Sequence, residues 1–182
     1  MHLTWYVARS SGIVSWALLA TSVLWGLALS TKVFGRRPRP NWLLDLHRFL
    51  GGAAVIFVGV HVLAVLFDTY THFGLADVLV PFASYWRPAA VAWGIAGFYL
   101  LLAVEITSLL RSRLSKKAWH TIHLLSYPLF LVSTLHFVTA GTDWSNLALR
   151  AVTGAVVSLV ALLTAVRVQQ DTTAAAKVEV HA

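Results

Sequence analysis

Five long apolar runs, separated by short polar segments, make up most of this chain. The runs are Gly12–Thr31, Leu46–Phe67, Pro88–Leu110, His120–Ala140 and Leu147–Val168. Each is about 20 residues long, which is the length that an α-helix needs to cross a hydrocarbon core about 30 Å thick. The residue-by-residue alternation of a membrane β-barrel is absent, and a helix satisfies its own backbone hydrogen bonds in lipid. The pattern therefore predicts an all-α integral membrane protein, a bundle of five transmembrane helices.

The basic residues lie mostly on one side of the predicted bundle. Eleven of the 14 lysines and arginines lie on the side where the first, third and fifth runs end, and Arg9, Arg87 and Arg150 lie on the other side. Positively charged segments favour the cytoplasm, so we expect the N-terminus outside the cell and the C-terminus in the cytoplasm. The distribution also accounts for the net charge of +7 without a nucleic-acid partner. The eleven are Lys32, Arg36, Arg37, Arg39, Arg48, Arg111, Arg113, Lys116, Lys117, Arg167 and Lys177.

The first run is expected to remain as a membrane helix. Residues 28–30 resemble a signal-peptide cleavage site. Cleavage would send the basic segment that follows across the membrane, against the charge rule. We therefore expect one membrane domain over residues 1–168, in a multi-pass protein of the cell membrane. The small and polar residues 169–182 are expected to form a disordered cytoplasmic tail.

The composition agrees with a membrane protein and limits its chemistry. Of the 182 residues, 58% are hydrophobic and 12% are charged, and the mean hydropathy is +0.74. A soluble domain has roughly 25% charged residues. The chain has no cysteine, which excludes disulfides, thiolate nucleophiles, iron–sulfur clusters and cysteine zinc sites. Histidine, with eight residues, is the abundant metal-ligand type that remains.

Four of the histidines lie in two parallel predicted helices. His47 and His61 are fourteen positions apart in the second run, and His123 and His136 are thirteen positions apart in the fourth. Fourteen residues rise about 21 Å and fall about 40° short of four turns, so His47 and His61 share a helix face. Thirteen residues miss a common face by about 140°. The fourth helix must therefore be distorted, and Pro128, between its two histidines, favours a distortion.

Similar depth in the membrane pairs these histidines across the two helices. His47 and His123 fall near the cytoplasmic ends, and His61 and His136 fall deeper, towards the outer side. Imidazole suits both axial positions of a haem iron, so two pairs predict two stacked haems that carry electrons. The alternatives are helix packing by the histidines, or a zinc or other transition-metal pathway. Ionisable groups in a membrane are costly and usually functional, which disfavours packing. No carboxylate follows His61 or His136 within the membrane to support a metal pathway.

Small and basic residues near the histidines suit a flat macrocycle with acidic groups. Gly51 lies one helical turn past His47, on the same face, and leaves room for a ring. Arg48 on the inside, and Arg9 and Arg87 on the outside, are candidates to pair with haem propionates. Ordinary helix packing for the glycine, and topology anchoring for each arginine, are the alternative interpretations.

Glu105 is a carboxyl group within the third run. It lies near the cytoplasmic end of that run, before Arg111. We expect it to reach the cytoplasmic face or to pair with a basic residue there. A proton or quinone role is the alternative.

Two segments resemble the ferric reductase-like transmembrane domain. They are Leu46-His-Arg-Phe-Leu-Gly51, followed by His61, and Trp119-His-Thr-Ile-His-Leu-Leu-Ser-Tyr127, followed by His136. This family includes the membrane parts of ferric reductases and NADPH oxidases. It also includes the haem subunit of a bacterial periplasmic methionine sulfoxide reductase system. The resemblance covers roughly residues 12–168.

The resemblance implies a transmembrane electron path with b-type haem. It implies that His47 and His123 hold an inner haem and that His61 and His136 hold an outer haem. His120, at a position that is often basic in relatives, competes with His123 as a ligand. Many relatives have six helices, whereas this sequence predicts five.

The residues and the resemblance together predict a transmembrane electron-transfer protein. Electrons are expected from a separate cytoplasmic flavoprotein or a quinol, and the acceptor is ferric iron, oxygen or an extracytoplasmic redox protein. No G-x-G-x-x-G fingerprint follows a strand pattern, so a flavin is expected only on a partner. Any oxidoreductase activity is expected to need that partner. The alternatives are a non-catalytic haem-binding anchor for a redox partner, and a metal or haem transporter.

Overall fold

Seven α-helices and one 3-10 helix form the part of the chain that the structure describes. The computed structural model describes residues 3–31, 35, 41–69 and 72–180, with side chains up to residue 173. Lys32, Arg36, Arg37 and Arg39 lie outside the described residues. The helices are α1 (Leu3–Ser30), α2 (Asn41–Leu66), α3 (Leu75–Leu79), α4 (Pro88–Leu109), η1 (Arg111–Arg113), α5 (Lys116–His123), α6 (Ser126–Ala140) and α7 (Leu147–Val180).

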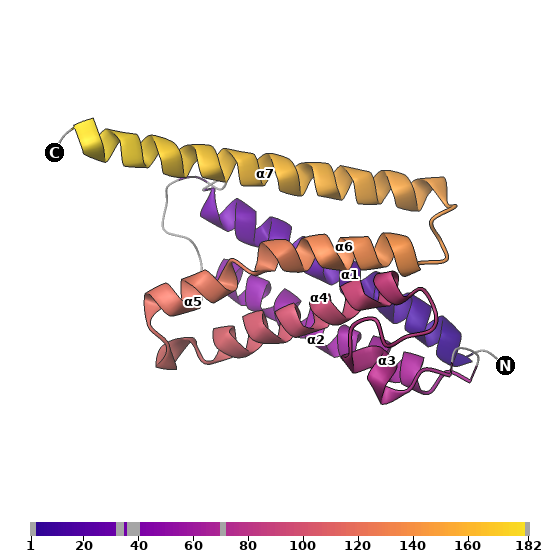
Figure 1. Ribbon diagram of the computed structural model, residues 1–182. Coiled ribbons are helices and arrows are strands. Elements are labelled where there is room, and N and C mark those ends of the chain that lie inside the picture. The colour runs from indigo at the N-terminus through magenta and orange to yellow at the C-terminus, as the bar shows by residue number, and fades with distance from the viewer. Residues whose placement is uncertain (1–2, 32–34, 36–40, 70–71, 181–182) are drawn as a thin grey trace.

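The five predicted membrane spans are confirmed. The first begins at Leu3, before Arg9 rather than after it, and Arg9 forms an ion pair with Asp143. The two ends of the chain lie at opposite ends of the bundle, as an odd number of crossings requires (Figure 1). Helices long and apolar enough to cross a bilayer cover Leu3–Ser30, Asn41–Leu66, Pro88–Leu109, Lys116–Ala140 and Leu147–Thr173.

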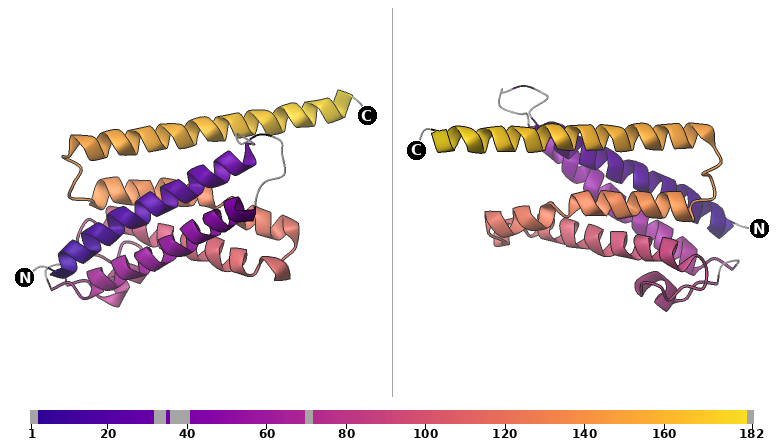
Figure 2. Two further views of the ribbon diagram at one scale, coloured as in Figure 1. Left: turned by 180° about the vertical axis from the view of Figure 1, so that it is seen from behind. Right: turned by 45° about the horizontal axis from the view of Figure 1, so that its top comes forward.

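Two antiparallel helix pairs enclose the interior of the bundle. α1 packs along α2, and α4 packs along α6 (Figures 1 and 2). α7 lies along the edge, where Val160 joins a core cluster with Ala20, Val23 and Leu27 of α1 and Phe130 of α6. The predicted histidine-bearing helices α2 and α6 therefore each have a neighbour, α1 or α4, that can hold their side chains.

The fourth span is broken between α5 and α6, as the spacing of His123 and His136 predicts. α5 ends at His123, and α6 begins shortly afterwards. Pro128 has no N–H to donate to the carbonyl of Leu124, four residues earlier. That carbonyl accepts instead from the backbone N–H of Tyr127, at 3.2 Å. The break changes the helical register, so both histidines face the interior.

The C-terminal segment differs from the expected disordered tail. α7 continues without interruption to Val180, so residues 169–180 are helical. Arg167 and Asp171, one turn apart, lie 3.7 Å from each other and span the start of this segment. Ion pairs at this spacing support a helix, and glutamine and alanine have high helix propensity. The helix propensity of these residues therefore accounts for the difference, although their small size and polarity suggest disorder.

Candidate functional site

Two pairs of histidine rings face each other inside the bundle. The ring centroids of the inner pair, His47 (α2) and His123 (α5), are 6.0 Å apart. Those of the outer pair, His61 (α2) and His136 (α6), are 6.2 Å apart, and the ring planes in both pairs are inclined by 77°. Metal–imidazole bonds of about 2.0–2.1 Å put the centroids of two imidazoles on opposite sides of one metal ion about 6 Å apart. The spacing in both pairs suits a shared metal ion.

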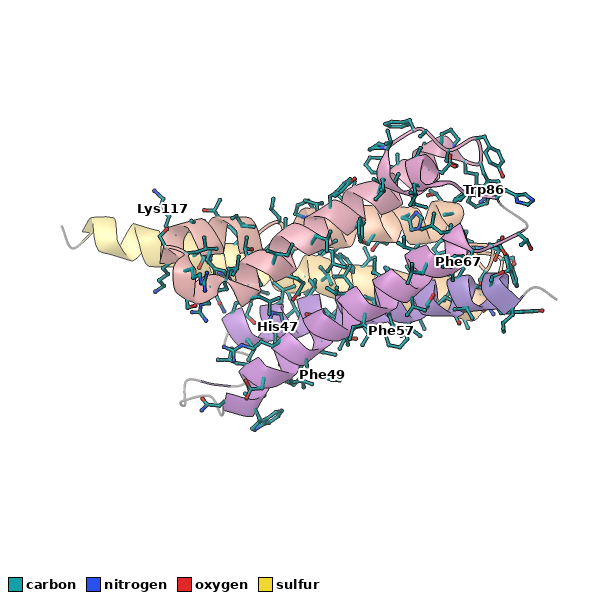
Figure 3. The ribbon with its side chains drawn as sticks, turned by 90° about the horizontal axis from the view of Figure 1, so that it is seen from below. His47, Phe49, Phe57, Phe67, Trp86 and Lys117 are labelled. Carbon is teal, nitrogen blue, oxygen red and sulfur yellow. The ribbon has the colours of Figure 1, made fainter. Side chains whose placement is uncertain are left out.

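His47 faces the interior, whereas nearby residues of α2 face outwards. In Figure 3, His47 lies on the side of α2 that faces α4 and α5, and Phe49 lies on the opposite side. Phe49 is correspondingly exposed on the surface of the bundle. His47 therefore projects into the bundle, whereas Phe49 belongs to its outer surface.

Backbone carbonyls hold both rings of the outer pair. His61 Nδ1 donates to Ala8 O at 2.7 Å, and His136 Nδ1 donates to Ala90 O at 2.8 Å. A carbonyl oxygen only accepts, so each Nδ1 carries the proton and each Nε2 keeps a lone pair. Metal-bound histidines show this arrangement, in which the second nitrogen bonds to a carbonyl or carboxylate. α1 and α4 thus set the tautomer and the orientation of the two rings.

Serine hydroxyls flank the rings of the inner pair. Ser22 Oγ of α1 lies 3.3 Å from His47 Nδ1, and Ser108 Oγ of α4 lies 3.5 Å from His123 Nδ1. The same two helices therefore support both pairs. A hydroxyl can donate or accept, so it holds the ring without deciding the tautomer.

Glycines of α1 lie directly against the histidines of α2. A Cβ atom at Gly12 would stand 3.0 Å from His61 Nδ1, and one at Gly26 would stand 3.2 Å from His47 Cε1. Gly12 and Gly26 have the same separation in the sequence as the two histidines, and antiparallel packing brings the two spacings into register. Sequence reasoning missed both glycines, although the equal spacing is a signal that could have found them.

α4 makes a similar close contact with His136 of α6, the other helix that carries a histidine of the outer pair. A Cβ atom at Gly94 would stand 2.7 Å from His136 Nδ1 and Cε1. Ser108, which lies beside His123, follows Gly94 at the same separation as that between Gly12 and Gly26. These positions were also missed in the sequence. Small residues on α1 and α4 let the imidazole rings approach the helix backbones closely.

A cavity of about 530 Å³ opens beside the outer pair. Sites for cofactors typically measure about 300–1,000 Å³. His61 and His136 both line the cavity, and so do the stacked rings of Trp16 and Phe137, whose centroids are 4.7 Å apart. The cavity therefore combines aromatic walls with two imidazoles that could serve as metal ligands.

Two arginines line this cavity at the end away from the inner pair. Arg9 forms an ion pair with Asp143 of the α6–α7 loop, and its guanidinium lies 4.9 Å from the ring centroid of Trp5. Arg87 Nη1 donates to Thr139 O at 2.8 Å. Both cations stand beside the cavity, where the sequence predicts partners for propionates, and Arg9 already has a carboxylate partner.

Two other predicted site residues face away from the histidine rings. The side chain of Arg48 is 67% exposed and bonds to Asp45 at 3.1 Å. Gly51 faces α4, where an added Cβ atom would overlap a carboxyl oxygen of Glu105. Gly51 therefore makes room for a carboxyl group rather than for one of the paired rings.

His123, rather than His120, faces the interior of the bundle. His120 is exposed. Trp119 stacks on His123, with centroids 5.0 Å apart and planes at 23°, and the guanidinium of Arg111 lies 4.5 Å from the Trp119 centroid. Within the described ranges, Trp119 Nε1 is buried without a hydrogen-bond partner. The inner pair thus has beside it a donor that a bound acceptor group could satisfy.

The described side chains offer metal ligands in pairs. Among them, no group of three or more His, Cys, Asp or Glu residues is arranged to hold a metal ion. Protein zinc sites use three or four protein ligands, whereas a haem iron needs two axial ligands at most. The pairs therefore suit haem better than zinc.

Two comparisons with known proteins found a match. A protein-family model described as ferric reductase like transmembrane component matches residues 11–134, a range that includes His47, His61 and His123 and ends just before His136. An uncharacterized protein of Archaeoglobus fulgidus is 30% identical over 121 residues. The match covers 62% of this chain and 63% of that protein, less than two thirds of its length. No solved structure matches the chain.

Proposed function

Because the chain belongs to the ferric reductase like transmembrane component family, we propose that it carries electrons across a membrane. We further propose that each histidine pair holds one b-type haem: His47 with His123, and His61 with His136. The observation that carries this proposal is the centroid spacing of 6.0 and 6.2 Å in two pairs built on the same helices. When bound, a haem supplies one-electron chemistry at its iron.

The residues around each pair fit such a group. Ala8 and Ala90 hold the outer rings with Nε2 free to bind a metal. The cavity of about 530 Å³ provides room beside them. At the inner pair, the unpartnered Nε1 of Trp119 provides a donor for an acidic or carbonyl group. The chain's part is to bind, orient and shield the two groups.

The two pairs lie in different halves of the membrane. The separation of His47 and His61 in α2 corresponds to about 21 Å along the helix axis. This distance is most of a hydrocarbon core about 30 Å thick. Two redox groups at these positions divide the crossing into short electron-transfer steps.

The donor and acceptor must act at the two ends of the bundle. If two histidines hold each group, they would leave no open position on the metal for a substrate. The inner end exposes Arg113, Lys116 and Lys117, a basic surface that suits an acidic flavoprotein; a quinol in the membrane is the other donor. Ferric iron, oxygen or a redox protein is the acceptor at the outer end.

Haem content and its response to histidine substitution test the proposal. We expect the purified, haem-replete protein to contain two b-type haems per chain by pyridine haemochrome assay. His61→Ala and His136→Ala should each remove the same haem, and His47→Ala and His123→Ala should each remove the other. His120→Ala is the matched control, because His120 is exposed beside Trp119, and it should keep both haems.

Several outcomes would contradict this function. A haem-replete preparation without bound haem would overturn the haem sites, and loss of different haems from His61→Ala and His136→Ala would overturn the pairing. In vesicles, a donor on the inner side should reduce both haems. Haems that are bound but are not reduced in this way would indicate an anchor rather than an electron carrier.

A further inference from the structure

The segment between α2 and α4 exposes an unusual number of apolar side chains. It contains α3 and the turns on either side of it. Phe82 is 70% exposed and Leu75 is 67% exposed, and Leu79, Val80 and Tyr85 are exposed as well. Figure 3 shows side chains of this segment pointing away from the bundle. In water, a cluster of this kind would be an unfavourable surface.

The other side of the same segment is firmly packed. Phe73 is buried against Val91 and Ile95 of α4, and Val78 and Trp86 pack on this cluster. The segment is therefore a fixed part of the fold, with one apolar side against the bundle and a second apolar side outwards. A loop in water would expose polar residues on its outer side.

A hydrogen bond shows how far along α4 this segment lies. Tyr99 Oη donates to Leu79 O at 2.8 Å. Tyr99 is eleven positions after Pro88, the first residue of α4, and this spacing corresponds to about 16 Å along the helix. Helical side chains lean towards the N-terminus of their helix, which leaves Leu79 about 10 Å below the start of α4.

The ribbon agrees with this depth. α3 lies beside α4, and it does not project beyond the start of α1 in any of the views (Figures 1 and 2). α4 is 22 residues long, or about 33 Å, which matches the thickness of the hydrocarbon core. A segment beside its first half is thus level with lipid rather than with water.

The charged groups of the segment do not oppose this placement. Asp77 Oδ2 accepts from the backbone N–H of Gly74 at 2.8 Å, so this carboxylate has a hydrogen-bond donor within the segment. His72 precedes the segment and Arg87 follows it. The residues between them that are exposed are apolar, and so are the exposed Leu63 near the end of α2 and Phe67 just after it.

We propose that residues 73–86 form a re-entrant segment whose outer side, Leu75, Leu79, Val80 and Phe82, is immersed in the acyl chains of one membrane leaflet. This is the leaflet at the level of the His61–His136 pair. The segment closes the bundle between α2 and α4, because Phe73, Val78 and Trp86 also line the cavity beside that pair. On this side, lipid rather than water lies behind the cavity wall. This inference does not depend on haem binding.

Single cysteines can test the immersion without background, because the chain has no native cysteine. Leu79→Cys and Phe82→Cys are labelled with a nitroxide in lipid nanodiscs, and collisions with oxygen and with a water-soluble nickel chelate are measured by EPR. Ile56→Cys, on the exposed apolar surface of α2, is the matched control for lipid. Ser145→Cys, exposed in the α6–α7 loop, is the control for water.

We expect the labels at positions 79 and 82 to resemble Ile56→Cys, with high access to oxygen and low access to the nickel chelate. High nickel access, as at Ser145→Cys, would overturn the proposal by placing the segment in water. Low access to both reagents would also overturn it, because a second copy or a partner protein would then cover the surface.

Discussion

A Cβ atom added at Gly94 would stand 2.7 Å from both Nδ1 and Cε1 of His136. Real Cβ atoms do not approach other heavy atoms so closely, so the ring rests directly on the backbone of α4. The carbonyl of Ala90, one turn earlier, accepts from Nδ1 of the same ring. Helix α4 therefore sets the position of His136 by contact and its orientation by hydrogen bonding.

We predict that Gly94→Ala removes the outer haem and leaves the inner haem bound. The added methyl group must displace the His136 ring, and ligand geometry tolerates little displacement. Haem content should fall from two per chain towards one, as measured by haemochrome assay. Alanine favours a helix over glycine by about 1 kcal/mol, so a weakened helix cannot explain the loss.

Gly59→Ala is the matched control for this prediction. Gly59 also lies in a membrane helix, two residues before His61, but an added Cβ atom there would meet nothing within 4 Å. This variant should keep both haems. If Gly94→Ala also keeps both haems with an unchanged spectrum, the contact between Gly94 and the His136 ring does not determine whether His136 binds the haem.

The inclined rings predict the EPR spectrum of the oxidised protein. Both pairs have ring planes at 77°. If the rings kept this angle when each pair held a proposed haem, the two π-symmetric d orbitals of the iron would be split only slightly, and the low-spin signal would be strongly anisotropic. We expect both haems to give signals of this type at low temperature. Two ordinary rhombic low-spin signals would show that the rings are close to parallel in the loaded protein.

The ion pair of Arg9 and Asp143 predicts a modest contribution to stability. Arg9 Nε donates to Asp143 Oδ2 at 2.6 Å, and a second nitrogen of the same guanidinium contacts the other oxygen. The side chains are 38% and 22% exposed, so we expect a coupling free energy of about 0.2–1 kcal/mol that falls with salt.

A double-mutant cycle with Arg9→Gln and Asp143→Asn, read from unfolding in detergent, measures this coupling. Asp45→Asn, in the more exposed pair with Arg48, is the control and should change stability little. Strictly additive effects of the two outer substitutions would show that the pair contributes nothing.

The charge distribution predicts which end of the bundle faces the cytoplasm. Ser112 and Ser145 are exposed at opposite ends of the bundle. The chain has no native cysteine, so a cysteine at either position would be the single site for labelling. In intact cells, a membrane-impermeant maleimide should label Ser145→Cys, whereas Ser112→Cys should react only after the membrane is opened. The reverse pattern would place the His61–His136 pair on the cytoplasmic side.

Hydropathy predicted the membrane spans, and residue type identified the four histidines within them as candidate ligands. A run of apolar residues is a local property, so its length alone predicts a membrane helix. A histidine inside such a run is costly, which draws attention to it before any fold is known. The helix break also followed from local rules, because Pro128 removes one specific donor and His123 and His136 need a change of register.

The contacts that hold the histidines could not be predicted in the same way. Gly51 shares a helix face with His47 in the sequence, yet in the structure it makes room for Glu105, and Gly26 of α1 meets the ring instead. Such contacts depend on how far each helix is rotated and where it crosses its neighbour. Rotation and crossing are set by packing along whole helices.

The sequence by itself determined that five helices cross the membrane and that four of their histidines are candidates for metal ligands. Only the tertiary structure decided that His61 and His136 rest on Gly12 and Gly94. The physical reason is that hydrophobicity is a property of each residue, whereas a glycine can contact a histidine ring only when two helices pack with the two residues at the same level.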